Sequence, residues 1–174
     1  EFKGKPELRK VSNGRLYYLA FNQKIPALKS KKVREALALA INRDDLVEKV
    51  LNGGGVKTTG VVADQMRGIS KEFREENGDL YAAYKNVDVK KLFDEGLKEE
   101  GMTKMPELEV IFADTGSTKM VAQYIQENLS KNLGIKLNLQ VVTGKERISR
   151  SKQRNYQIAI ANWTGDFKDP ITYL

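Results

Sequence analysis

The sequence contains neither cysteine nor histidine among its 174 residues. The absence of cysteine excludes disulfides, thiolate zinc sites and cysteine nucleophiles. The absence of histidine removes the commonest general base, the Ser/His/Asp triad and nearly every imidazole metal site. The starting hypothesis is therefore a protein that is not an enzyme and that needs no cofactor.

Long apolar runs and phosphate-binding loops are missing as well. No run approaches the roughly 18 apolar residues that a membrane-spanning helix needs. The closest approach to a glycine-rich loop, at residues 53–55, follows a helical pattern. It therefore indicates a helix end and a turn, and not a nucleotide-binding fingerprint.

The composition is that of a globular domain, with 40% hydrophobic and 30% charged residues. This length allows one domain, or a fragment of about one and a half. The chain starts without Met or an apolar leader, and its last residues, 169–174, open a helix with Asp and Pro but stop within one turn. We therefore expect a piece cut from a longer protein.

The net charge is +7, and the densest basic segment, residues 145–154, holds five cations and one acid. A nucleic-acid-binding module is one alternative function that this balance allows. A solvated helix face explains the segment more simply, because cations and acids alternate through the rest of the chain. A carboxylate enzyme that uses Asp166 and Asp169 is a further alternative, although no second acidic motif accompanies them.

Hydrophobic periodicity in the first half predicts a buried strand over 15–22, followed by helices. Ser30 is the expected N-cap of a helix that ends near 41, and residues 42–45 are expected to interrupt it before a second short helix over 46–51. Residues 56–86 lack a clear pattern, so mostly loop is expected, with one helical turn near 80–84.

The second half predicts a helix from Asp88 to about Glu100 and then alternating strands and helices. A strand at 108–113, a helix with Ser117 as its N-cap and Gly134 as its end, and a strand at 135–141 form a βαβ unit with parallel strands. A basic helix over 145–154 and a strand at 156–163 follow. The expected architecture is α/β, with helices packed on a sheet.

Four stretches of this sequence also occur together, in this order, in a known family. They are YYLAFN at 17–22, SKKVREALALAINRDDLVEKVLNGGG at 30–55, the strand–helix–strand unit that ends in NLGIKLNLQ at 132–140, and NWTGDFKDPITYL at 162–174. Through them the sequence resembles the extracytoplasmic solute-binding proteins of the oligopeptide and dipeptide ABC importers, solute-binding protein family 5. The resemblance implies a mixed sheet with packed helices, one lobe of a periplasmic-binding-protein type II fold.

The resemblance also implies a function and a setting. Residues 1–174 would be a single α/β lobe, most of the C-terminal lobe of a two-lobed receptor, with the N-terminal lobe and the chain after 174 absent. The receptor would capture extended oligopeptides between its lobes and deliver them to the membrane permease, without catalysis. Its partners would be an oligopeptide and the permease subunits, with no nucleic acid. It would be extracytoplasmic, in a periplasm or lipid-anchored at the outer face of the cell membrane.

The resemblance suggests five substrate-binding residues. Asp166 falls on the family position whose carboxylate pairs with the peptide α-ammonium, and its alternative role is a turn or helix-cap residue. Asn162 and Thr164 fall where main-chain groups meet the peptide backbone. Trp163 lies in the same motif, with a core or hinge-facing position as its alternative. Tyr17 falls on a strand position that can face the cleft, although a core position is the simpler expectation.

Some positions depart from the family pattern. Ile160 and Ser151 stand where some relatives carry arginines that meet the carboxylate end of short peptides, and Gly144 stands near a position that some relatives fill with Trp. These departures leave the length and the side-chain preference of the ligand open.

Overall fold

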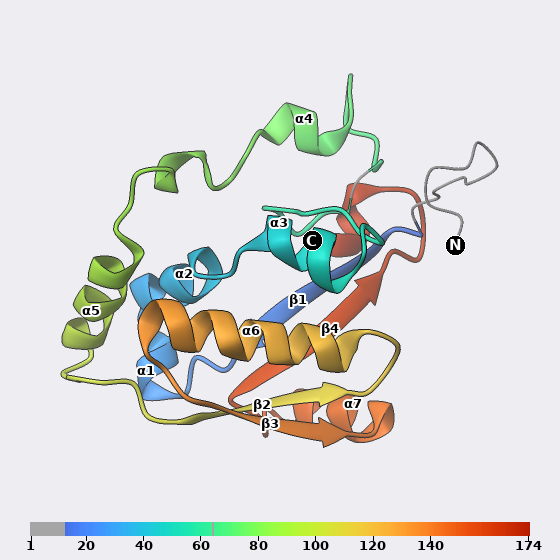
Figure 1. Cartoon of the computed structure of the whole chain (residues 1–174). Coiled ribbons are helices and arrows are strands. Elements are labelled where there is room, and N and C mark those ends of the chain that lie inside the picture. Colours follow the sequence, from blue (N-terminus) through green and yellow to red (C-terminus); the bar gives the residue numbers. More distant parts are fainter. Residues whose placement is uncertain (1–12, 64) are drawn as a thin grey trace. The chain divides into compact units, whose positions relative to one another are not determined.

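The computed structural model describes residues 13–63 and 65–174, shown in Figure 1. The described chain forms two compact units. The larger unit comprises residues 18–57 and 83–161, and the described part of the smaller unit comprises residues 13–17, 58–63, 65–82 and 162–174. The expectation that residues 1–174 form a single lobe remains a prediction.

A four-stranded sheet has the strand order β1-β4-β2-β3. Its strands are β1 (Arg15–Phe21), β2 (Leu108–Ala113), β3 (Leu137–Val142) and β4 (Ile158–Thr164). Strand β2 pairs in parallel with both β3 and β4. Strand β1 runs the opposite way, because the N–H of Asn22 after its end donates to the carbonyl of Gln157 before β4 (2.9 Å). The mixed sheet expected from the sequence is therefore confirmed.

The βαβ unit is confirmed too. Helix α6 (Thr118–Leu133) connects the parallel strands and lies along both of them in Figure 1. Gly134 ends the helix in the left-handed conformation, at φ 70°. Ser117 occupies the expected N-cap position, but its side chain forms no cap hydrogen bond. The Thr118 hydroxyl donates to the carbonyl of Thr115 at 2.7 Å and closes the turn that precedes the helix.

The first helices differ from expectation in one place. After α1 (Pro26–Lys29), the Ser30 hydroxyl accepts from the Val33 N–H and caps α2 (Lys31–Leu39), as predicted. The predicted break between two helices is present, but it lies at residues 40–42, and the expected position at 42–45 is too late. The Asn42 side chain caps helix α3 (Arg43–Asp45), which continues directly into the π-helical turn η1 (Leu46–Val50). Acidic residues fit this first turn because a helix N-terminus carries partial positive charge.

The remaining helices are mostly as expected. Asp88 caps α5 (Val89–Glu99), and the basic segment forms α7 (Gly144–Lys152). Within 56–86 the turn η2 (Ala82–Tyr84) was expected, but α4 (Phe73–Asn77) was not. Helix α4 has no buried residue, so it leaves no hydrophobic period in the sequence.

The core of the larger unit surrounds strand β2. Val110, Ile111 and Phe112 are all buried, so both faces of this strand are covered. A central strand of this kind does not show a clear alternation of buried and exposed residues. The core cluster also takes residues from α1, α2, α5, α6, β3 and β4, and from the connecting positions 40, 41 and 135. No helix of the described residues is both long enough and apolar enough to cross a membrane.

Candidate functional site

Strand β4 leaves the core as it approaches its carboxyl end. Residues 158–161 are buried, Asn162 is half-buried, and Trp163 and Thr164 are exposed. Pairing with β2 reaches only Ile111↔Ala159, so residues 162–164 extend beyond it on that side. Ligands of open α/β sheets bind outside the carboxyl ends of the strands. The carboxyl end of β4 is therefore the candidate ligand site.

The short helix η3 (Pro170–Tyr173) holds the chain that follows β4. The Tyr173 hydroxyl donates to the carbonyl of Gly14 and accepts from the Gly165 N–H at 3.2 Å. A Cβ on Gly165 would lie 2.8 Å from both the Tyr173 hydroxyl and the Thr172 methyl carbon. Glycine is therefore required at 165 for this close approach.

Thr172 makes two further contacts within this segment. Its carbonyl accepts from the Trp163 indole N–H at 2.8 Å, and its hydroxyl accepts from the backbone N–H of Asp166 at 3.1 Å. Trp163 remains 44% exposed, so the core alternative for this residue is wrong. Thr172 of η3 thus positions the indole of Trp163 and the backbone of Asp166, while the indole ring stays partly accessible.

The Asp166 carboxylate is exposed, and it forms no hydrogen bond or ion pair with any residue that the structure describes. The neighbouring acid behaves differently. The Asp169 carboxylate accepts from the Ile171 N–H at 2.9 Å and caps η3. The helix-cap alternative for Asp166 is therefore wrong, because Asp169 fills that position.

The other two expected site residues lie on the sheet. Asn162 is half-buried on β4. Tyr17 on β1 is 50% exposed, so the expected core position is wrong for this tyrosine. Tyr17, Trp163, Asn162, Thr164 and Asp166 all belong to the smaller unit.

One residue beside this end of β4 escaped the sequence analysis. The Arg15 guanidinium Nε donates to the Thr164 hydroxyl at 3.2 Å. The two residues are 149 positions apart in the sequence, and only the neighbouring positions of β1 and β4 bring them together. No local motif could have indicated this contact.

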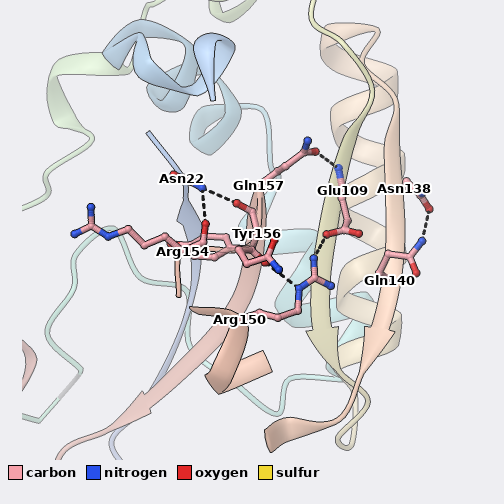
Figure 2. Close-up of polar contacts among 9 residues, drawn as sticks. Asn22, Glu109, Asn138, Gln140, Arg150, Arg154, Tyr156 and Gln157 are labelled. Atoms are coloured by element: carbon pink, nitrogen blue, oxygen red, sulfur yellow. Dashed lines mark hydrogen bonds and ion pairs between the residues drawn. The ribbon is translucent and has the colours of Figure 1, made fainter. Parts of the chain in front are cut away.

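The other end of β4 is anchored inside the larger unit, as Figure 2 shows. The Asn22 side chain donates to the carbonyls of Arg154 and Tyr156 at 3.1 and 2.7 Å. The Gln157 side chain accepts from the Glu109 N–H of β2 at 2.6 Å. These contacts fix where β4 begins relative to β1 and β2.

Arg150 of α7 takes part in the same network. It pairs with the Glu109 carboxylate and donates through Nε to the carbonyl of Asn155 at 2.9 Å (Figure 2). One of the five cations in the basic segment is therefore used to fasten α7 to β2. The four others, Lys145, Arg147, Lys152 and Arg154, form no ion pair within the described residues.

The sequence profile of the bacterial extracellular solute-binding proteins, family 5 Middle, matches residues 1–174. The chain belongs to this family. The members are solute-binding proteins and not enzymes, so the carboxylate-enzyme alternative has no support.

Individual relatives agree with the family assignment. The oligopeptide-binding protein OppA of Bacillus subtilis is 30% identical over 165 residues, which are 91% of this chain and 29% of the relative. A dipeptide-binding protein of Lactococcus lactis subsp. cremoris is 31% identical over 153 residues, covering 85% of this chain and 27% of the relative. This chain spans less than a third of the length of these curated relatives.

Solved structures show the same fold. Listeria monocytogenes OppA bound to peptide is 27% identical, with a TM-score of 0.84 over 99% of this chain and 35% of that protein. The substrate-binding domain of an oligopeptide ABC transporter from Bacillus anthracis is 28% identical, with a TM-score of 0.82 over 92% of this chain and 32% of that protein. The nucleic-acid alternative gains no support from these relatives.

Proposed function

We propose that this chain is the ligand-binding part of the substrate-binding component of a peptide ABC transporter. The whole protein captures extended oligopeptides between two lobes and delivers them to permease subunits in the membrane. Residues 1–174 supply most of the C-terminal lobe, and the N-terminal lobe comes from another part of the same protein. The protein works outside the cytoplasm, in a periplasm or lipid-anchored at the outer face of the cell membrane.

The observation that carries this proposal is the Asp166 carboxylate. It is exposed at the end of β4 and has no partner among the described residues, while its backbone N–H is held by Thr172. A fixed carboxylate is the natural partner of a peptide α-ammonium, because hydrogen bonds between opposite charges are about twice as strong as neutral ones. In this proposal Asp166 anchors the amino end of the peptide.

Main-chain groups at the end of β4 support the same proposal. Residues 162–164 extend past the pairing with β2, so the N–H and C=O groups of Asn162 and Thr164 are placed to meet an extended backbone. Strand addition of this kind binds a peptide without reading its sequence. The exposed rings of Trp163 and Tyr17 offer apolar contact surface for peptide side chains.

The test is Asp166→Asn in the whole protein that the gene encodes, measured by calorimetry. If the carboxylate holds an ammonium in a closed cleft, its loss leaves a buried charge unpaired and costs about 3–5 kcal/mol of binding free energy. The loss should be much smaller for a peptide whose N-terminus is acetylated, because that peptide never makes the contact. The melting temperature should hardly change.

Asp169→Asn is the matched control. Its side chain caps η3, and an asparagine oxygen can accept the same hydrogen bond, so this substitution removes a charge but should hardly change the melting temperature and should change peptide affinity far less than Asp166→Asn does. Unchanged affinity of Asp166→Asn for a peptide with a free N-terminus would refute the ammonium anchor.

A further inference from the structure

Arg15 presents an unpaired cation at the start of β1. Its Nε donates to the Thr164 hydroxyl (3.2 Å), and its backbone N–H donates to the Asn13 side chain (3.0 Å). The residue is exposed, and its guanidinium forms no ion pair within the part of the chain that the structure describes. One nitrogen is thus used for positioning, and the two terminal amino groups are available to a ligand.

The main chain at Arg15 lies close in space to the main chain at Asp166, the proposed ammonium anchor. The Tyr173 hydroxyl binds both the Gly14 carbonyl and the Gly165 N–H. Arg15 directly follows the first of these glycines, and Asp166 directly follows the second. The two opposite charges form no ion pair with each other, so both are available to the same ligand.

We propose that Arg15 is a specificity-determining residue that selects peptides with a carboxylate side chain near their amino end. This inference rests on the proposed function. A guanidinium binds a carboxylate through two parallel N–H···O hydrogen bonds. A side-chain amide of the same shape cannot replace the carboxylate in this pairing. An extended peptide advances about 3.3 Å per residue. If its ammonium group is held at Asp166, the side chains of its first two residues therefore lie closer to Arg15 than those of later residues.

The experiment measures the affinity of the whole encoded protein for two pairs of tetrapeptides. One pair is Glu-Ala-Ala-Ala and Gln-Ala-Ala-Ala, and the other is Ala-Glu-Ala-Ala and Ala-Gln-Ala-Ala. The unaltered protein should bind the glutamate peptide of at least one pair about 5- to 20-fold more tightly. Arg15→Gln should abolish that preference and leave the affinity for the glutamine peptide within about twofold.

Two control variants separate selection from packing. Lys145→Gln removes one positive charge from α7, which belongs to the larger unit, and should keep the full preference. Arg15→Lys keeps the charge but loses the planar fork, so it should retain only part of the preference. A purely structural Arg15 would instead weaken both members of a pair equally.

The possible results are distinct. A glutamate preference that survives in Arg15→Gln overturns the inference, as does equal binding of both members of each pair by the unaltered protein. Binding of none of the four peptides overturns the proposed function itself, and the selectivity falls with it. Binding of all four without any preference leaves the proposed function standing and rejects the role of Arg15.

Discussion

At the scale of single residues, the Glu76 carboxylate shows how a loop can be built around one charge. It accepts from the backbone N–H groups of Ile69, Ser70 and Lys71 at 3.0, 2.6 and 2.9 Å, and from the Ser70 hydroxyl at 3.0 Å. These donors, the Ser70 N–H first among them, lower the pKa of Glu76 from 4.5 to about 2. The loop therefore favours the charged form.

This contact predicts a pH dependence of stability. Because the pKa of Glu76 is lower in the folded protein, its contribution is fully present above a pH of about 4.5 and is lost as the pH falls toward about 2. Glu76→Gln should therefore be less stable than the unaltered protein at pH 6, and the gap in melting temperature should shrink toward pH 2. Glu75→Gln, at an exposed neighbour, should show no comparable pH-dependent gap. A gap of constant size for Glu76→Gln would contradict the assignment.

At the scale of elements, helices α2 and α5 approach each other through a glycine. A Cβ on Gly96 would lie 2.8 Å from the Ser30 hydroxyl and from the Val33 nitrogen, and 2.9 Å from the Lys32 Cβ. Lys32 also binds Glu95 and Glu99 of α5 at 3.1 and 2.8 Å. The capped start of α2 thus rests directly on the backbone of α5.

Gly96→Ala provides a test of this packing. In an isolated helix the change would stabilise by about 1 kcal/mol. Here the added methyl meets backbone and cap atoms, so we expect a loss of about 1–3 kcal/mol in the free energy of unfolding. Denaturant titration measures it, and Lys98→Ala, at an exposed position of the same helix, should stay within about 0.5 kcal/mol. A Gly96→Ala protein as stable as the original would show that the helices can separate freely.

Elements differ in how well the sequence predicts them. Ser30, Asp88 and Gly134 act on atoms a few residues away, so their capping roles followed from local rules. Helix α4 was missed because none of its side chains is buried. The start of the second helix was predicted too far along the sequence, because Asn42 suggested a break. The Asn42 side chain instead caps the helix that follows it.

At the scale of the whole molecule, the proposed site is only part of a binding surface. Tyr17 and Trp163 are 50% and 44% exposed, and Asp166 is exposed as well. Sites for small ligands usually bury about 70–90% of the ligand surface. In the proposed function, the rest of that enclosure comes from the other lobe of the same protein.

Residues 1–174 alone should therefore bind oligopeptides weakly. We expect a dissociation constant above about 100 μM, because the ligand stays hydrated on its open side. The whole encoded protein, measured with the same peptides, should bind far more tightly. Sub-micromolar affinity of residues 1–174 alone, found by calorimetry, would show that this region encloses its ligand without a second lobe.

The amino-acid sequence by itself determined the α/β class, most element positions and several helix ends, those at Ser30, Asp88, Gly134 and Asp169, because these depend on periodicity and on contacts within one helical turn. The family motif also placed Asp166, Trp163, Asn162, Thr164 and Tyr17 among the candidate residues. Only the tertiary structure decided that the Asp166 carboxylate has no partner among the described residues, whereas Asp169 takes the cap position that the sequence had indicated. The contact between Arg15 and Thr164 also depends on the tertiary structure. The two residues are 149 positions apart, and their strands become neighbours only when the sheet forms.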